Sequence, residues 1–169
     1  MNSNKILVTG GSGQLGSELK ELSESYPDLD LVFYSRNEFP VQDVAIARKI
    51  FEEQQPAFLI NCAAYTAVDK AESELENANE INGAAVGMLS LLCKEFNSRF
   101  IHISTDYVFD GDATLPITET SRVDPVNAYG KSKLLGEALA MENNPSSIII
   151  RTAWVYSAFG KNFVKTMLR

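Results

Sequence analysis

The feature that most constrains the fold is a glycine-rich turn, residues 10–16 (GGSGQLG), between an apolar run and a helical pattern. Glycine has no Cβ and tolerates positive φ, so the chain can turn sharply off a strand and bring backbone N–H groups close to a phosphate. The helix that follows would direct the positive end of its dipole at the same point. Because glycine clusters also occur in ordinary turns, the rest of the chain decides between a phosphate cradle and a simple turn.

Apolar runs and helical patterns alternate along the whole chain. Short apolar runs without polar alternation are typical of strands buried on both faces of a parallel sheet, whereas a 3.6-residue period is typical of helices. Strands are predicted over 5–9, 29–34, 58–61, 99–105 and 147–152, and helices over 14–26, 44–54, 74–96, 127–142 and 162–169. This order predicts the α/β class and a doubly wound parallel sheet of the Rossmann type, covered on both faces, as one dinucleotide-binding domain over residues 1–169.

Composition excludes several classes of protein. No apolar run approaches the roughly 20 residues that a membrane span needs, and the net charge of −7, without a Lys/Arg run, argues against a nucleic-acid partner. Cys62 and Cys93 lack metal-ligand or disulfide spacing, so we expect free thiols and no metal site. The first residues lack the apolar core of an export signal, which leads us to expect a cytoplasmic protein.

Polar residues collect where the predicted strands end. They lie in residues 10–16, 61–66, 104–107 and 152–156. Ligands of open parallel sheets bind outside the carboxyl ends of the strands, so these four segments are expected to form one site.

Tyr129 and Lys133 lie four residues apart at the start of a predicted helix, which places their Cβ atoms about 5–6 Å from each other. A cation about 5 Å from a phenol, at an effective dielectric near 20, is worth about 3 kcal/mol and lowers the pKa of the phenol by roughly 2 units. Such a phenol suits the reduction of a ketone, in which hydride reaches carbon and a proton reaches oxygen. A hydroxyl of Ser104 or Thr105 would hydrogen-bond the same oxygen. A plain surface pair on a helix is the alternative.

These motifs together resemble the extended short-chain dehydrogenase/reductases, and among them the dTDP-4-dehydrorhamnose reductases. The resemblance spans the chain and is carried by residues 10–16, 61–64 (NCAA), 104–111 (STDYVFDG), 129–133 (YGKSK) and 151–156 (RTAWVY). It implies reduction, by NAD(P)H, of the 4-keto group of dTDP-4-dehydro-6-deoxy-L-mannose to give dTDP-L-rhamnose, with that dTDP-sugar as the partner. The tyrosine and lysine pair also favours a glycine register at positions 10, 13 and 16 over one at 11, 13 and 16.

The resemblance implies roles for individual residues. Thr105 would polarise the carbonyl, Tyr129 would donate the proton, and Lys133 would lower the pKa of the phenol and hold the nicotinamide ribose. The implied cofactor-binding set is Gly10, Gly13, Gln14, Leu15 and Gly16 at the pyrophosphate, Asp43 and Val44 at the adenine, and Ala63, Ala64, Tyr65 and Thr66 along the ribose and phosphate. The implied substrate set is Thr66, Val68, Thr105, Asp106, Tyr107 and Trp154, with core packing an equal alternative for Trp154.

Two departures from the family pattern matter. The second predicted strand ends without the carboxylate that often binds the ribose 2′-hydroxyl of NAD, and Arg36 nearby would suit a 2′-phosphate. We therefore expect NADPH as the preferred cofactor and NADH as an alternative. The alternative for Arg36 is an ordinary surface arginine without a role in binding. Family members continue into a smaller carboxyl-terminal substrate lobe. Because this sequence stops at Arg169, we expect a truncated chain that lacks that lobe, binds cofactor and has little turnover.

The alternative functions are a non-catalytic regulatory subunit resembling the partner of methionine adenosyltransferase, and a nucleotide-sugar epimerase that retains NAD. Gly83, Ala84, Ala85 and Gly87 indicate a helix pressed against another backbone or a partner, which is compatible with a homodimer. His102, inside a predicted strand, is expected to be packed and hydrogen-bonded rather than catalytic.

Overall fold

The computed structural model describes residues 4–168, which form a five-stranded parallel sheet in the order β2-β1-β3-β4-β5. The strands are β1 (Lys5–Thr9), β2 (Asp30–Tyr34), β3 (Phe58–Asn61), β4 (Arg99–Thr105) and β5 (Ile148–Thr152). The order reverses between β1 and β3, and a crevice is expected at that reversal. The predicted α/β class and the parallel, doubly wound sheet are confirmed.

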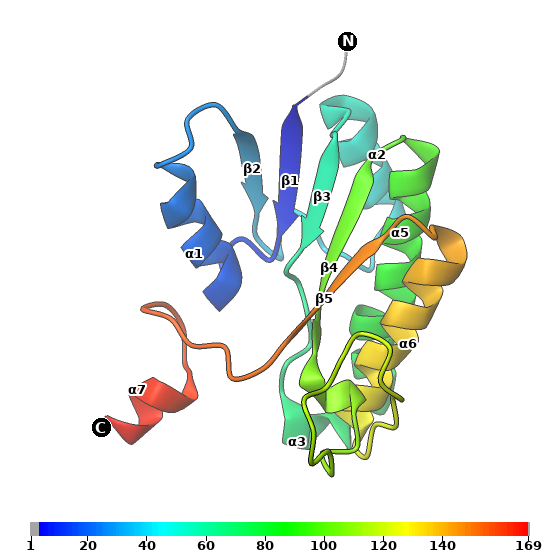
Figure 1. Ribbon diagram of the computed structural model, residues 1–169. Helices are drawn as coiled ribbons and strands as arrows, with labels where there is room; N and C mark the ends of the chain where they lie inside the picture. Colours follow the sequence, from blue (N-terminus) through cyan, green and yellow to red (C-terminus); the bar gives the residue numbers. More distant parts are fainter. Residues whose placement is uncertain (1–3, 169) are drawn as a thin grey trace.

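Helices cover the two faces of the sheet unequally. They are α1 (Gln14–Ser23), α2 (Val44–Gln54), α3 (Val68–Ala71), α4 (Leu75–Asn79), α5 (Ala85–Glu95), α6 (Ala128–Asn143) and α7 (Phe163–Met167). The crossover from β1 to β2 runs in one direction along the sheet, and the crossovers from β2 to β3, β3 to β4 and β4 to β5 run in the other. Because such crossovers are right-handed, α1 lies on one face and α2, α5 and α6 lie on the other (Figure 1). The larger layer of helices therefore lies on the α5 side.

The core follows from the two-residue alternation of the strands. Leu7, Leu59 and Phe100 occupy neighbouring strands and are buried against α5. Ile148 and Ile150 point to the opposite face and are 42% and 43% exposed. The prediction of a sheet covered on both faces therefore holds on the α5 side, whereas β5 stays partly exposed on the α1 side.

The expected single helix over residues 74–96 is divided. It begins as α4, continues through a π-helical turn, η1 (Glu80–Ala84), and resumes as α5. A Cβ on Gly83 would lie 2.6 Å from Leu135 Cδ2, and one on Gly87 would lie 2.8 Å from Leu139 Cβ. The two glycines therefore allow close packing on α6 of the same chain, so they give no support to a homodimer.

Two short elements follow the carboxyl ends of β3 and β4. They are α3 and a 3₁₀ turn, η2 (Asp106–Val108), which directly follows β4.

Within residues 4–168, no helix is both long and apolar enough to cross a membrane.

Candidate active site

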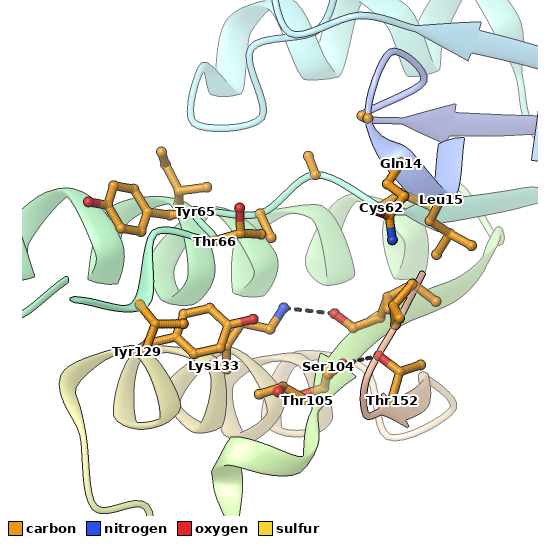
Figure 2. A pocket seen from close by; sticks show the side chains of 18 of the residues that line it. Gln14, Leu15, Cys62, Tyr65, Thr66, Ser104, Thr105, Tyr129, Lys133 and Thr152 are labelled. Atoms are coloured by element: carbon orange, nitrogen blue, oxygen red, sulfur yellow. Dashed lines mark hydrogen bonds between the residues drawn. The ribbon is translucent and has the colours of Figure 1, made fainter. Parts of the chain in front are cut away.

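A cleft of about 620 Å³ opens at the carboxyl ends of the strands. Figure 2 shows Tyr65 and Thr66 on one side and Thr105, Tyr129 and Lys133 on the other. The cleft is lined by most residues that the sequence singled out: Gly10, Gly13, Gln14, Leu15, Arg36, Ala63, Ala64, Tyr65, Thr66, Val68, Thr105, Asp106, Tyr107, Tyr129, Lys133 and Trp154. The four polar segments at the strand ends thus form one site.

The glycine-rich turn is the tightest part of the cleft. Gly10 has φ +67°, and a Cβ there would lie 2.8 Å from the Ala63 amide nitrogen. Gly16 does not line the cleft. It lets α1 pack closely against the turn, because a Cβ there would lie 2.3 Å from the Gly10 carbonyl oxygen. The left-handed residue is Gly10 rather than Gly11, which supports the glycine register at 10, 13 and 16.

This turn fits a pyrophosphate. Gly13 is the N-cap of α1 and has no side-chain cap, and its amide donates to the Gly10 carbonyl at 2.9 Å. The first amides of a helix have no partner within it, and Gln14 and Leu15, the first residues of α1, line the cleft. The positive end of α1 and these amides are the groups that bind a phosphate anion.

Asp43 and Val44 lie at the start of α2, outside the cleft lining. The Asp43 carboxylate accepts hydrogen bonds from the amides of Ala45 and Ile46, both at 3.0 Å, and so caps the helix. Val41 and Gln42 line the cleft in their place. The adenine role of Asp43 and Val44 stays a prediction.

Arg36 is exposed and lines the cleft just beyond the end of β2. Among residues 4–168, no ion pair involves its guanidinium. The nearest acidic side chain along the chain, Glu38, is turned onto the Ser35 amide, which donates to it at 2.8 Å. A cation without an acidic partner among the described residues therefore lines the cleft at this end.

The start of α6 is held from two sides, which fixes Tyr129. Asn127 caps the helix by accepting from the Gly130 amide at 2.7 Å, and Glu72 accepts from the Ala128 amide at 2.8 Å. The Tyr129 ring packs edge-on against Tyr107, with 5.6 Å between ring centres. The phenol therefore has one defined position in the cleft wall.

The electrostatics of Tyr129 differ from the expectation. Burial raises the pKa of the phenol above its ordinary value; a hydrogen bond with Thr105 opposes the rise, and the Asp106 carboxylate adds to it. The effect of Lys133 on this pKa stays a prediction. Desolvation outweighs a cation that is itself buried, so the phenol keeps its proton at neutral pH.

Lys133 is 1% exposed and is held by β4. Its Nζ donates to the Ile103 carbonyl at 2.7 Å and lies 3.1 Å from His102 Nε2. Burial lowers the pKa of Lys133 to about 8, although Glu137 opposes the change. His102 is fully buried and hydrogen-bonded, as expected from the sequence.

Sequence reasoning missed Asn82, a buried residue of the π-helical turn. Its Oδ1 accepts from the Tyr65 amide at 2.9 Å, and its Nδ2 donates to the Tyr65 carbonyl and to Ser132 Oγ, both at 3.0 Å. These bonds tie the loop after β3 to α6. An asparagine inside an apolar, small-residue helix was the available signal, because a buried amide needs partners.

Trp154 lies at the rim of the cleft. It is 75% exposed, has φ +53°, and its ring packs edge-on against Phe163 at 5.2 Å between ring centres. Core packing, the alternative for this residue, is therefore wrong.

The chain is similar to known proteins over almost all of its length. Residues 4–169 match the RmlD substrate binding domain family. A dTDP-4-dehydrorhamnose reductase of Burkholderia thailandensis is 46% identical over 166 residues, which are 98% of this chain and 55% of that protein.

Two solved structures share the fold closely. A dTDP-4-dehydrorhamnose reductase of Clostridium acetobutylicum is 42% identical with a TM-score of 0.93, over 97% of this chain and 58% of that one. One from Bacillus anthracis, in complex with NADP, is 34% identical with the same TM-score and coverage. The chain thus spans little more than half the length of the relatives it matches. The match over almost all of its own length shows that the chain belongs to the RmlD substrate binding domain family.

Proposed function

We propose that this chain supplies the cofactor-binding and catalytic part of a dTDP-4-dehydrorhamnose reductase. The reaction is reduction of the 4-keto group of dTDP-4-dehydro-6-deoxy-L-mannose to dTDP-L-rhamnose. The observation that carries the proposal is the convergence of Thr105, Tyr129 and Lys133 on the cleft that the glycine-rich turn also lines.

The residues divide the work between them. Tyr129, whose pKa is raised by burial, holds a proton at neutral pH and donates it to the carbonyl oxygen of the sugar. Thr105, on the same wall, hydrogen-bonds that oxygen and shares the negative charge that develops on it. Asp106, Tyr107 and Trp154 line the side of the cleft on which the nucleotide-sugar would lie.

The cofactor in this proposal is NADPH in preference to NADH. The bound dihydronicotinamide would supply the hydride. Amides at the start of α1 would hold the pyrophosphate, Lys133 would hold a ribose hydroxyl, and Arg36 would pair with the 2′-phosphate. The NADP complex of the Bacillus anthracis relative, which is 34% identical, supports this choice.

We also propose that the protein is a homodimer and that it is located in the cytoplasm. Light scattering of the purified chain tests the first, and cell fractionation tests the second. Neither bears on the chemistry of the cleft.

The test uses a chimera in which residues 4–169 replace the matching segment of the Burkholderia thailandensis reductase. We expect the chimera to oxidise NADPH in the presence of the keto sugar and to form dTDP-L-rhamnose, identified by NMR. The control is the parent reductase under the same conditions. A chimera that binds NADPH as its parent does, but leaves the keto sugar unchanged, would contradict the proposal.

A further inference from the structure

After β5 the chain runs back towards α1 past the carboxyl ends of the strands (Figure 1). Residues 157–162 form a return loop that reaches Gln14, the first residue of that helix. Asn162 Nδ2 donates to Gln14 Oε1 at 3.3 Å, and a Cβ on Gly160 would lie 3.6 Å from Gln14 Cβ. Lys161, the residue between these two contacts, is therefore held beside the start of α1.

Hydrogen bonds within the segment fix the shape of the return loop. Asn162 Nδ2 also donates to the Ser157 carbonyl at 2.9 Å. Lys165 Nζ, from α7, donates to the Gly160 carbonyl at 3.1 Å and to the Ala158 carbonyl. The ammonium group of Lys165 is thus used to build the loop, whose backbone is ordered without a ligand.

Lys161 brings a positive charge to the cleft. It is exposed and lines the cleft, and among residues 4–168 no ion pair involves its ammonium group. Glu18, one turn along α1, also contacts the return loop, but its Oε1 accepts from the Ala158 amide at 3.3 Å. A cation that lines a cleft without an acidic partner attracts anionic ligands.

The lining of the cleft is positively charged, although the whole chain has a net charge of −7. The lining contains three basic side chains and one acidic side chain, those of Arg36, Lys133, Lys161 and Asp106. Lys133 is engaged by the Ile103 carbonyl, and Arg36 lies beyond β2. The basic side chain at the start of α1 is therefore Lys161, where its charge adds to the positive end of the helix dipole.

We propose that Lys161 binds a diphosphate group at the start of α1, where the return loop holds it. This rests on the proposed function, which places the pyrophosphate of the cofactor at that helix. An ammonium group donates charge-assisted hydrogen bonds to phosphate oxygens, in addition to those from the backbone amides of the helix. The dTDP-sugar of the proposed reaction also has a diphosphate, but the contacts of the return loop with Gln14 favour the cofactor.

The first test is isothermal titration of NADPH and of NADH into the 169-residue chain and its Lys161→Ala variant at low ionic strength. Both cofactors have the same pyrophosphate, so the Kd should rise about three- to tenfold for both, and by less at high salt, because one exposed charge contact is lost. An unchanged Kd would overturn the proposal. A rise for NADPH alone would also overturn it, because Lys161 would then bind the 2′-phosphate.

Two matched variants separate a local contact from a change of net charge. Lys161→Arg keeps the positive charge and should bind both cofactors nearly as the wild type does. Lys94→Ala removes an exposed lysine of α5 that does not line the cleft, and should leave both Kd values unchanged. Equal rises in Lys94→Ala and Lys161→Ala would show that net charge alone acts, and would overturn the proposal.

The second test identifies the source of the diphosphate by titrating dTDP into the chimera with and without Lys161→Ala. We expect the Kd for dTDP to stay unchanged while that for NADPH rises. A rise for dTDP alone would keep Lys161 as a diphosphate ligand and would assign it to the nucleotide-sugar.

The chimera also separates this proposal from the proposed function. A Lys161→Ala chimera that binds NADPH, NADH and dTDP as its parent does, and that still reduces the keto sugar, would overturn the role of Lys161 and leave the reductase function untouched. A chimera that binds neither nicotinamide cofactor, with Lys161 intact, would contradict both.

Discussion

Glu137 of α6 and Arg151 of β5 form a two-pronged ion pair, with 2.6 Å between Arg151 Nη2 and Glu137 Oε2 and 3.0 Å between Arg151 Nε and Glu137 Oε1. Ser104 of β4 donates to the same carboxylate at 2.5 Å. Lys133 lies one turn earlier on α6. The pair thus pins the helix that carries Tyr129 and Lys133 to two strands of the sheet.

Glu137→Gln should lower the free energy of unfolding by about 2–3 kcal/mol. Removing one partner of a buried ion pair costs about 3–5 kcal/mol, and the Arg151 side chain is 25% exposed, which reduces that cost. Urea unfolding measures the change. The matched control is Asp124→Asn, which breaks the exposed pair with Arg122 and should leave stability unchanged. Equal losses in both variants would contradict the role of the Glu137 pair.

Gly10→Ala should weaken NADPH binding at least about tenfold and destabilise the chain by more than 1 kcal/mol. The methyl group would meet the Ala63 amide nitrogen at 2.8 Å in a backbone conformation with φ +67°. Gly111→Ala is the control, because Gly111 also has positive φ, +86°, but has nothing within 4 Å of its added Cβ. Isothermal titration should show unchanged NADPH binding in the control, and equal weakening in both would rule out the steric argument.

Arg36→Ala should discriminate between the two nicotinamide cofactors. A charged hydrogen bond to a phosphate is worth about 1.5–3 kcal/mol, so the Kd for NADPH should rise about 10- to 100-fold while that for NADH changes little. Fluorescence titration of both cofactors measures this. Arg122→Ala, at an exposed arginine that does not line the cleft, serves as the control. Equal losses for NADPH and NADH would place Arg36 elsewhere than at a 2′-phosphate.

The sequence was sufficient for the sheet and for most of the cleft because both rest on local patterns. An apolar run without alternation marked β1, and the glycine-rich turn marked the expected phosphate end of the cleft. The π-helical turn at Glu80–Ala84 was not predicted, and the hydrogen bond of its Asn82 joins a residue, Tyr65, that lies 17 positions away in the sequence.

The sequence was a poor guide to electrostatics. The spacing of Tyr129 and Lys133 gave the right neighbours, but the sign of the pKa shift at Tyr129 depends on how far both groups are buried, which is set by β4 and α6 together. The hydrogen bond between Asn61 and His102 likewise depends on strand register. Such pairings between distant segments leave no local pattern to read.

Lys133 should make stability depend on pH in a defined window. Its pKa falls from 10.5 in the unfolded chain to about 8 in the folded one, so between these values the unfolded state binds more protons. Stability from this residue is therefore present above pH 10.5 and lost as the pH falls to 8, by roughly 3 kcal/mol in all. Wild-type stability should rise relative to Lys133→Met from pH 8 to 10. Parallel curves in urea unfolding would contradict the lowered pKa.

The central claim is that Tyr129 donates the proton to the sugar oxygen, and kcat of Tyr129→Phe in the chimera measures this most directly. The variant removes one hydroxyl and keeps the ring that packs against Tyr107. We expect kcat for the keto sugar to fall by about 100- to 10,000-fold with the Kd for NADPH nearly unchanged. A Tyr129→Phe chimera that reduces the keto sugar at the parent rate would show that another group supplies the proton.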